Sequence, residues 1–299
     1  MITVFGSINM DLIATTTRLP QPGETVAGTG FSTAAGGKGA NQALAATRAG
    51  ASVRMAGAVG QDAFAQDALA LLEQGGTDLT SVARLPGATG TAHILVDGEG
   101  ENVIVVVPGA NGAPSPSDAD AVVGSMAAGD ILMLQLEIPA ASIERALTGA
   151  RQKGVTTIIN IAPLTDEAAR LGRMADIVVA NETEFERLAG RGGLTGEERE
   201  TALLSLHGDG GQTIVVTLGA DGVVAAREGK LFHAKGLKIT PVDTVGAGDT
   251  FCGYLAASLD AGLDFEAALR RAAVAGSLAC LEQGAQPSIP VAAEVDAKV

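Results

Sequence analysis

Short apolar runs alternate along the chain with longer segments in which apolar residues recur at helical spacing. Most of the short runs are apolar at successive positions, which is typical of strands that are buried on both faces. Such strands are predicted at residues 2–7, 52–60, 130–137, 155–163, 175–181 and 213–219. Helices are predicted at residues 39–49, 63–74, 139–152, 182–189, 197–207, 248–261 and 265–281. This alternation predicts an α/β fold, with a doubly wound, mostly parallel sheet between two layers of helices.

Two segments rich in Thr, Val and Ile, residues 9–35 and 88–107, break the alternation. The second segment favours a β-hairpin around its "DGEGE" sequence. Because strands without crossover helices must pair with one another, we expect a small β-sheet that stands off the main sheet. That sheet could act as a lid over a substrate, or it could be a hairpin without such a role. Residues 108–120, "PGANGAPSPSDAD", are predicted to form a surface loop.

The overall charge narrows the choice of partners. The chain has 20 Lys and Arg residues against 34 Asp and Glu residues, a formal net charge of −14. This charge disfavours nucleic acids and anionic membrane surfaces as partners. No apolar stretch approaches the roughly 18 to 20 residues of a membrane span. The first residues, "MITVFGSINMD", lack the basic and apolar regions of a secretion signal. We therefore expect a soluble cytoplasmic protein, in which Cys252 and Cys280 are small buried hydrophobic residues.

Several common kinds of catalytic site have no counterpart in the sequence. The three histidines and two cysteines show no metal-ligand spacing, which disfavours a transition-metal site. The chain contains neither the GxSxG motif of serine hydrolases nor the GxxxxGK[ST] motif of P-loop NTPases. A Rossmann GxGxxG motif with a ribose-binding acid about 20 residues further on is also missing, which disfavours a dinucleotide-dependent dehydrogenase.

The most informative segment is "DTVGAGDTF", which precedes a predicted helix. Gly246 and Gly248 permit positive φ angles and close approach of a ligand, so that several main-chain N–H groups can converge at the helix start. Such a site binds an anion such as phosphate without lysine side chains. Asp249, on the first helical turn, could be a helix cap. The flexible glycines before it favour instead a base that deprotonates a hydroxyl beside a transferring phosphoryl group.

Two further segments contain groups that suit substrate binding. "GSINMD" places Asn9 and Asp11 on the same side of extended backbone after the first strand, where they could bind neighbouring hydroxyls or form a turn. "GGKGANQA" is a second glycine-rich start of a helix and contains Gly37, Lys38, Gly39 and, on the first helical turn, Asn41. Ligand contact with bare backbone explains these glycines better than an ordinary helix start does.

Three more segments follow predicted strands. "MLQLE" ends in Glu137 at the carboxyl edge of the sheet, where open α/β sheets bind ligands, although a solvated strand end is equally compatible. "NETE" contains Asn181, Glu182 and Glu184, which suggest help with Mg²⁺ through water molecules. Acids on a first helical turn also complement the helix dipole, so this indication is weak. "TLGADG", residues 217–222, could pass under a nucleotide base.

These motifs, taken in order, resemble the ribokinase-like sugar kinase family over nearly the whole chain. The matching segments are "GSINMD" (6–11), "GGKGANQA" (36–43), "GENVI" (100–104), "MLQLE" (133–137), "NETE" (181–184), "TLGADG" (217–222), "DTVGAGDTF" (243–251) and "GAQPSIP" (284–290). The resemblance implies a single ribokinase-like α/β domain over residues 1–299, with a lid sheet formed from about 9–35 and 88–107. It also implies ATP-dependent phosphorylation of the 5-hydroxyl of D-ribose, which gives D-ribose 5-phosphate.

The resemblance assigns roles to individual residues. The catalytic set is Asp249 as the base, with the backbone of Gly246, Ala247, Gly248 and Asp249 as the anion hole. The sugar-binding set is Asn9, Asp11, Gly37, Lys38, Gly39, Asn41, Glu137 and Asp249. The nucleotide-binding set is Asn181, Thr217, Leu218, Gly219, Ala220, Asp221, Gly222 and Gly248. An activating K⁺ would be held by Asp243, Val245, Ala279, Glu282, Gly284 and Ser288. ATP and Mg²⁺ are implied as well, as is a homodimer formed through the lid sheets.

The sequence departs from the family pattern at two positions, and it leaves two alternative functions open. Glu282 stands where relatives often carry a basic residue, and Ala273 stands where a larger polar residue can lie near the adenine. A related kinase for deoxyribose, fructose, another sugar or a nucleoside is one alternative. One Tyr, seven Phe and no Trp leave few rings to stack on a base, which disfavours a nucleoside. A non-catalytic sugar-binding protein is the other alternative, although it would have no need of Asp249 as a base.

Overall fold

The computed structural model describes all residues from Met1 to Val299 and contains two β-sheets. The main sheet has nine strands in the order β13-β12-β11-β10-β9-β8-β1-β4-β5. Its strands are β1 (Ile2–Phe5), β4 (Val53–Val59), β5 (Asp78–Arg84), β8 (Ile131–Leu134), β9 (Thr156–Asn160), β10 (Ile177–Asn181), β11 (Thr213–Thr217), β12 (Val223–Arg227) and β13 (Lys230–Ala234). Every neighbouring pair from β5 to β11 is parallel, whereas β12 and β13 are antiparallel additions at one edge.

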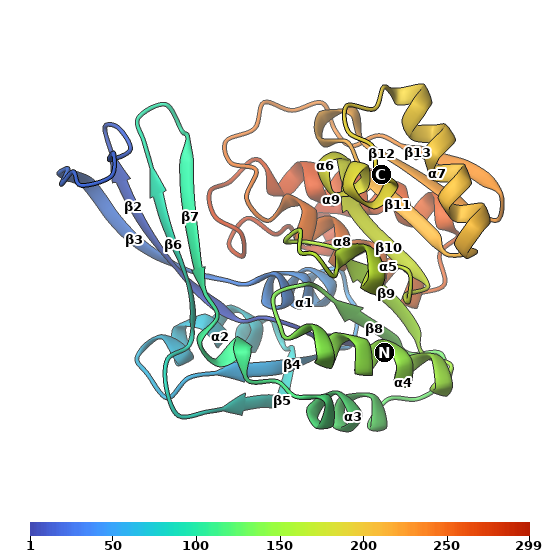
Figure 1. The fold of residues 1–299 in the computed structure, drawn as a ribbon, viewed down its shortest axis with the longest axis horizontal. Helices are drawn as coiled ribbons and strands as arrows, with labels where there is room; N and C mark the ends of the chain where they lie inside the picture. The colour runs from blue at the N-terminus through green and yellow to red at the C-terminus, as the bar shows by residue number, and fades with distance from the viewer.

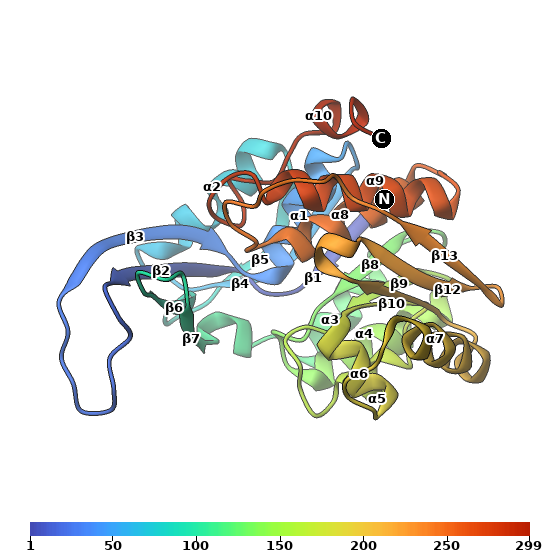
Figure 2. The same ribbon diagram turned by 90° about the horizontal axis from the view of Figure 1, so that it is seen from above.

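Helices cover both faces of the main sheet, as Figure 2 shows. One layer contains α1 (Lys38–Arg48), α2 (Phe64–Gly75), α8 (Ala247–Asp260), α9 (Phe265–Ala279) and α10 (Ala292–Asp296). The other layer contains α3 (Pro116–Gly124), α4 (Ala140–Lys153), α5 (Ala168–Gly172), α6 (Glu182–Ala189) and α7 (Gly196–Gly210). Each layer closes its own hydrophobic core, one around Leu44 and Tyr254 and the other around Leu147 and Phe185. The predicted doubly wound sheet is therefore confirmed.

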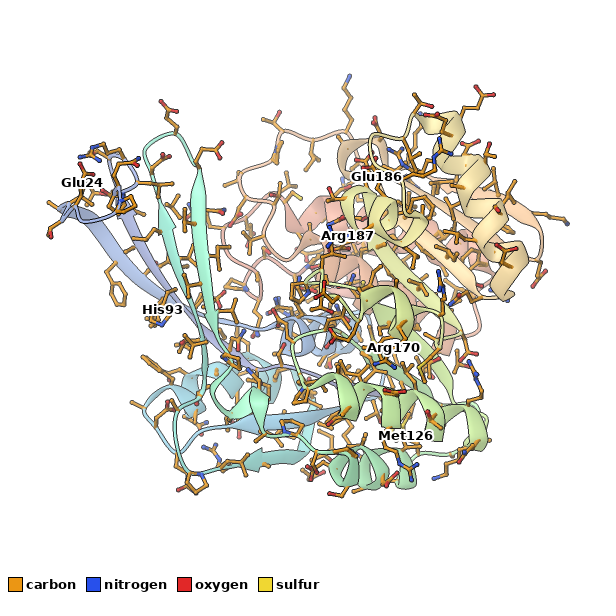
Figure 3. All side chains as sticks on the ribbon, viewed as in Figure 1. Glu24, His93, Met126, Arg170, Glu186 and Arg187 are labelled. Carbon is orange, nitrogen blue, oxygen red and sulfur yellow. The ribbon has the colours of Figure 1, made fainter.

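The second sheet has four strands in the order β3-β2-β6-β7. These strands are β2 (Asn9–Thr16), β3 (Gly28–Gly36), β6 (Gly90–Val96) and β7 (Asn102–Val107). Figure 1 shows this sheet standing away from the helix-covered body, and Figure 3 places Glu24 at its tip. The hairpin predicted around "DGEGE" is present, since β6 and β7 are antiparallel neighbours. We call this sheet the lid sheet.

The prediction of a surface loop over residues 108–120 is wrong. A 3₁₀ helix, η1 (Gly109–Gly112), contains the buried residue Asn111, whose side chain bonds both main-chain groups of Ile8. Pro116 then opens α3, because Ser115 and Asp118 form a reciprocal capping box at its start. Other unpredicted elements are β5, β12, β13, α5, α10 and η2 (Gly219–Asp221).

The two cysteines differ in burial, and both are free thiols. Cys252 is buried, as predicted, whereas Cys280 is only partly buried, so the prediction was wrong in that detail. None of the helices is both long and apolar enough to cross a membrane.

Strand β1 marks the point at which the direction of winding reverses. The chain continues from β1 to β4 and β5 on one side, and it later adds β8, β9, β10 and β11 on the other side. In open α/β sheets, ligands bind beside the carboxyl ends of the strands at such a reversal. The segments that follow β1 and β8 are "GSIN" (6–9) and "QLE" (135–137), which belong to two of the predicted motifs.

Candidate active site

The carboxyl ends of β1 and β8 are joined by hydrogen bonds that also fix the start of α1. Ser7 Oγ donates to Glu137 Oε2 at 2.5 Å. The main-chain N–H of Lys38 donates to the same oxygen at 3.0 Å, and that of Gly39 donates to Ser7 Oγ at 3.2 Å. Glu137 thus binds the first turn of α1 through one oxygen and leaves its other oxygen for a ligand.

The glycines before and within the first turn of α1 allow it to pack directly on the backbone after β1. Gly37 has φ +90°, and an added Cβ would lie 2.7 Å from the main-chain nitrogen of Asn9. A Cβ at Gly39 would lie 2.6 Å from the main-chain nitrogen of Ser7. Both approaches are closer than a side chain permits, so these glycines have a structural reason beside any contact with a ligand.

Asp249 lies on the first turn of α8, and its carboxylate is held by two amide side chains of α1. Asn41 Nδ2 donates to Oδ2 at 3.0 Å, and Gln42 Nε2 donates to Oδ1 at 2.9 Å. Gly246 is the N-cap of α8, and no side chain caps this helix. Asp249 is therefore not a helix cap, which was the alternative interpretation of this residue, and its buried carboxylate is available for chemistry.

Small residues bring α8 close enough to α1 for these bonds. An added Cβ at Gly253 would lie 2.7 Å from both the carbonyl oxygen of Gln42 and the main-chain nitrogen of Ala46. Gly253 follows Asp249 by one helical turn and faces the same side of α8. The glycine therefore sets the distance at which the Asp249 carboxylate meets the two amides.

Most main-chain N–H groups of the predicted anion hole at the start of α8 have no hydrogen-bond partner in the protein. The N–H groups of Gly246, Gly248 and Asp249 donate to no group of the protein, whereas Ala247 N–H donates to Thr244 O at 3.3 Å. Nothing lies within 4 Å of the position that a Cβ on Gly248 would occupy. Three of the four predicted N–H groups can thus donate hydrogen bonds to an anion at the positive end of the helix dipole.

A cavity of about 210 Å³ adjoins this helix start. The residues that line it are Lys38, Asn160, Ala162, Val179, Ala180, Asn181, Glu184, Thr217, Thr244, Gly246, Gly248, Asp249 and Cys252. A smaller cavity of about 150 Å³ below α5 and α6 shares Glu184 but contains none of the anion-hole groups. The larger cavity is therefore the candidate site for a phosphate-bearing ligand.

Charge is concentrated around this cavity. Burial, followed by the charges of Glu137 and Asp249, raises the pKa of Asp11 to about 7. The negative charge of Asp249, followed by those of Glu137 and Glu184, raises the pKa of Lys38 above its usual value. Burial also raises the pKa of Glu184. Lys38 is thus a cation among carboxylates, and it has no ion-pair partner within 4 Å.

Of the residues predicted to bind sugar, Lys38 and Asp249 line this cavity, whereas Asn9 and Asp11 lie at the base of the lid sheet, outside its lining. Asn9 and Asp11 begin β2, and Asn9 Oδ1 accepts a bond from Asn111 Nδ2 at 2.7 Å. Gly36 packs against the Asp11 carboxylate, where an added Cβ would lie 2.6 Å from Oδ1. Asn41 Oδ1 is buried and has no hydrogen-bond partner, so it is free to accept a bond from a ligand hydroxyl.

The predicted nucleotide-binding residues are only partly gathered at the cavity. Asn181 and Thr217 line it, whereas Gly219, Ala220 and Asp221 are exposed in η2. Asn181 also caps α6, since its Oδ1 accepts the Glu184 N–H at 2.8 Å and Glu184 Oε2 accepts the Asn181 N–H at 2.8 Å. Glu182 does not line the cavity, and it pairs with Arg199 on α7 at 2.6 Å.

The predicted cation-binding residues come from two segments that Asp243 ties together. Its Oδ1 accepts the N–H of Val245 at 3.0 Å, and its Oδ2 accepts the N–H of Gly284 at 2.9 Å. The hydroxyl of Ser288 donates to Ala285 O at 3.1 Å. Four predicted ligands present main-chain carbonyl oxygens that accept no hydrogen bond from the protein: Val245, Ala279, Glu282 and Gly284. Such an oxygen set fits a hard cation.

Several residues of the site were not singled out from the sequence. Ser7, Gln42 and Gln135 lie inside quoted motifs, and their bonds join segments 130, 207 and 93 residues apart. The cavity lining contains three further residues that were not assigned to the site: Asn160, Thr244 and Cys252. Asn160 lies within the strand predicted over residues 155–163 and ends the observed strand β9, so its place near the carboxyl edge of the sheet was the available signal.

Comparison with known proteins places this chain and its fold among the carbohydrate kinases. Residues 1–292 match the pfkB family carbohydrate kinases over almost the entire chain. The chain therefore belongs to the pfkB family, and the predicted family resemblance and ribokinase-like fold are confirmed.

The relatives include both ribokinases and deoxyribokinases. A ribokinase from Haemophilus influenzae is 36% identical over 294 residues, which cover 98% of this chain and 96% of the relative. A deoxyribokinase from Salmonella typhi is 34% identical over 291 residues, which cover 97% and 95%. Among solved structures, an Arabidopsis thaliana ribokinase complexed with ribose and ATP has a TM-score of 0.89 at 31% identity, covering 99% of this chain and 97% of that one.

Proposed function

We propose that this chain is an ATP-dependent kinase that phosphorylates the 5-hydroxyl of D-ribose to give D-ribose 5-phosphate. The observation that carries the proposal is the buried Asp249 carboxylate on the same helical turn as the free N–H groups of Gly246 and Gly248. A base beside an anion hole is the arrangement that phosphoryl transfer to a hydroxyl requires. The ribokinase from Haemophilus influenzae, at 36% identity, supports ribose as the acceptor.

In the reaction, Asp249 takes the proton of the acceptor hydroxyl. The hydroxyl oxygen forms a bond to the γ-phosphorus of ATP while the bond from that phosphorus to the bridging oxygen of ADP breaks. The free N–H groups of Gly246, Gly248 and Asp249 stabilise the negative charge on the phosphoryl oxygens. Lys38 supplies a positive charge at the same cavity, in addition to the sugar-binding role predicted for it.

The sugar would bind between the start of β2 and the start of α1. Asp11 can accept bonds from two neighbouring hydroxyls, and Asn41 Oδ1 and the second oxygen of Glu137 can each accept another. Asn9, Gly37, Lys38 and Gly39 border the same space through side chain or backbone. The lid sheet, which carries Asn9 and Asp11, would then exclude water from the transferring group.

The nucleotide would occupy the cavity beside α8. The base of the nucleotide would lie beside Asn181 and the turn from Thr217 to Gly222, which also contains Leu218, Gly219, Ala220 and Asp221. Mg²⁺ fits next to Glu184, whose carboxylate lines the cavity, since Mg²⁺ retains several waters and needs few protein ligands. Mg²⁺ would neutralise phosphate charge. K⁺ fits the oxygen set around Asp243, where it would hold the backbone before the anion hole in place.

The proposal is tested by replacing Asp249 with Asn. We expect kcat to fall by at least about 10²-fold, because general-base catalysis is worth roughly 10²–10⁴-fold. Ribose affinity, measured by calorimetry, should change little, since Asn retains the shape of the side chain. Asp260→Asn on the same helix is the control and should keep wild-type kcat. Near-normal turnover of Asp249→Asn in a steady-state assay would refute the assigned base.

The second candidate acceptor is 2-deoxyribose, which the deoxyribokinases at 34% identity support. A site that binds a hydroxyl rejects an analogue without it, so we expect kcat/KM for ribose to exceed that for 2-deoxyribose by at least roughly tenfold. A preference for 2-deoxyribose would overturn ribose and leave the kinase assignment intact. ADP release with no sugar in a panel would favour a non-catalytic sugar-binding protein.

We further propose that the chain acts in the cytoplasm as a homodimer paired through the lid sheets. Free thiols, as in Cys252 and Cys280, are usual in a reducing compartment. The lid sheet supports pairing because its edge strand β7 exposes a run of apolar side chains: Val103, Ile104, Val105, Val106 and Val107.

A further inference from the structure

Beneath Asp249 lies a row of amide side chains to which no role has been assigned. Gln42 donates its Nε2 to Asp249 Oδ1 at 2.9 Å and to Asn160 Oδ1 at 3.3 Å. Gln135, which follows β8, donates its Nε2 to Gln42 Oε1 at 2.7 Å. Gln42 is 1% exposed and Gln135 is 0% exposed. Solvent therefore does not compete for these bonds, and the row forms a continuous chain from the sheet to the carboxylate.

The bonding pattern fixes the direction of every amide group in the row. The Asp249 carboxylate only accepts hydrogen bonds, so Gln42 must turn its NH₂ group toward it and its oxygen toward Gln135. Asn160 donates Nδ2 to Val179 O at 3.1 Å, which leaves its oxygen facing Gln42. Turning the Gln42 amide over would place its oxygen against two other oxygens and break all three of its bonds.

The row contains one destabilising polar atom whose presence packing does not explain. Gln135 Oε1 is buried without a hydrogen-bond partner. It lies against Gly6, where an added Cβ would overlap it. An unpaired buried acceptor is destabilising, and an apolar side chain of similar size would avoid that cost. The NH₂ group of Gln135 has a clear use, however, because it holds Gln42 in its one productive orientation.

We propose that Gln42 is a positioning residue for the base Asp249, and that Gln135 acts on Asp249 only through Gln42. The proposal rests on the function proposed above for Asp249. Gln42 on Oδ1 and Asn41 on Oδ2 together fix the plane of the carboxylate. Each oxygen keeps a lone pair for the acceptor hydroxyl, so the row orients the base without contacting substrate.

The first test replaces Gln42 with Met, which keeps the length of the side chain and removes its donors. We expect kcat to fall by at least roughly tenfold, the effect of one lost hydrogen bond to a charged group. The ribose KM should stay within about twofold, since Gln42 does not contact the sugar in this proposal. Unchanged kcat in the folded variant would overturn the proposal.

The second test uses Gln135→Met, alone and combined with Gln42→Met. Gln135→Met should lower kcat in the same direction but by less, because Gln42 is still present and only its orientation is released. The double variant should match Gln42→Met within about twofold, since two residues in one chain of contacts are not additive. Two independent structural defects would instead multiply, and that result would overturn the proposal. If Gln42→Met is unstable, Gln135→Met alone decides the question, and a wild-type kcat in that variant would overturn the proposal.

Two controls separate this inference from the proposed function. Thr47→Val removes a hydroxyl from the same helix, where Thr47 bonds Ala43 O and Thr77, and it should leave kcat unchanged. The orientation of the Asp249 carboxylate, seen in crystal structures of both Gln variants without substrate, should change even if the chain phosphorylates no sugar. Its charged and titratable neighbours, Lys38, Asp11, Glu184 and Cys252, are the same in every variant. An unmoved carboxylate would overturn the inference alone.

Discussion

Asp11 is the clearest single residue at which function and stability oppose each other. Its carboxylate is packed against Gly36 and is raised to a pKa of about 7, first by burial and then by Glu137 and Asp249. The charged form is therefore disfavoured in the folded protein, yet it is the form that accepts two hydroxyl hydrogen bonds. A group held in an unfavourable state beside other carboxylates is typical of a binding site.

We predict that Asp11→Asn weakens ribose binding by roughly 1–3 kcal/mol, the effect of lost charged hydrogen bonds, while kcat changes less. An unchanged ribose KM in steady-state kinetics would contradict the assignment of Asp11 to the sugar. The same substitution should stabilise the fold above neutral pH. The folded pKa of Asp11, about 7, lies above its usual value of 3.8, so the folded state binds more protons in this interval and loses stability as pH rises through it.

The stabilisation predicted for Asp11→Asn should depend on pH, and a measurement at low pH provides its control. In urea titrations, Asp11→Asn should raise the free energy of unfolding at pH 8 by up to about 4 kcal/mol, at 1.36 kcal/mol per unit of pKa shift. At pH 4 the wild-type carboxyl is protonated in the folded protein, so the variant should gain almost nothing. A gain of equal size at both pH values would show that packing, and not charge, separates the two proteins.

At the scale of the secondary-structure elements, the start of α8 combines a helix with an anion site. Gly248 has open space where a Cβ would lie, and it lines the cavity. We predict that Gly248→Ala folds at least as well as wild type, because Ala is favoured over Gly in helices by up to about 1 kcal/mol. Its methyl group would occupy the approach to the free N–H groups. We expect kcat/KM for ATP to fall at least roughly tenfold, as for a lost charged hydrogen bond.

Gly208 offers a matched control on α7. It also has nothing within 4 Å of an added Cβ, but it does not line the cavity. Gly208→Ala should raise the melting temperature slightly and leave kcat/KM for ATP unchanged. If Gly248→Ala kept the wild-type kcat/KM, the phosphate would have to bind elsewhere.

The observed helices and strands show which elements can be predicted from the sequence. The central strands and the long helices were predicted within a few residues, because burial on one or both faces imposes a clear period. Strand β5 was missed because it is an edge strand with exposed and half-buried residues in no regular order. Helix α3 was missed because its Pro and Ser residues indicated a loop, although Ser115, Pro116 and Asp118 together form a helix start.

The site was predictable at its motifs and not at its internal bonds. The glycines and Asp249 carry their chemistry in local spacing. The link from Gln42 to Asp249 spans 207 residues, and it depends on how closely Gly253 lets α8 approach α1. Spacing along the chain contains no information about that approach, so the neighbours of the base became visible only in three dimensions.

The whole molecule sets the conditions under which the site works. A net charge of −14 repels a nucleotide at long range, so the proposed nucleotide binding would depend on the local amide groups of α8 and on Lys38. The sugar-side residues Asn9 and Asp11 lie on the lid sheet, whereas Asp249 lies on the body. The proposed chemistry therefore requires the lid sheet to be held firmly against the body, and pairing of two lid sheets would provide that rigidity.

The last prediction tests this pairing. Val105 on the edge strand β7 is 58% exposed, and a lysine there places a charge among apolar side chains, which discourages association between strand edges. We expect the wild-type protein to have twice the mass of one 29.8 kDa chain in light scattering, and Val105→Lys to have the mass of one chain. Leu204→Lys replaces an exposed apolar residue on α7, far from the lid sheet, and should stay dimeric.

The monomeric variant should show a higher ribose KM, because its lid sheet loses its support while Asp249 and its amides are unchanged. A Val105→Lys protein that remained a dimer would move the interface away from β7, and a monomeric variant with a normal ribose KM would separate assembly from sugar binding.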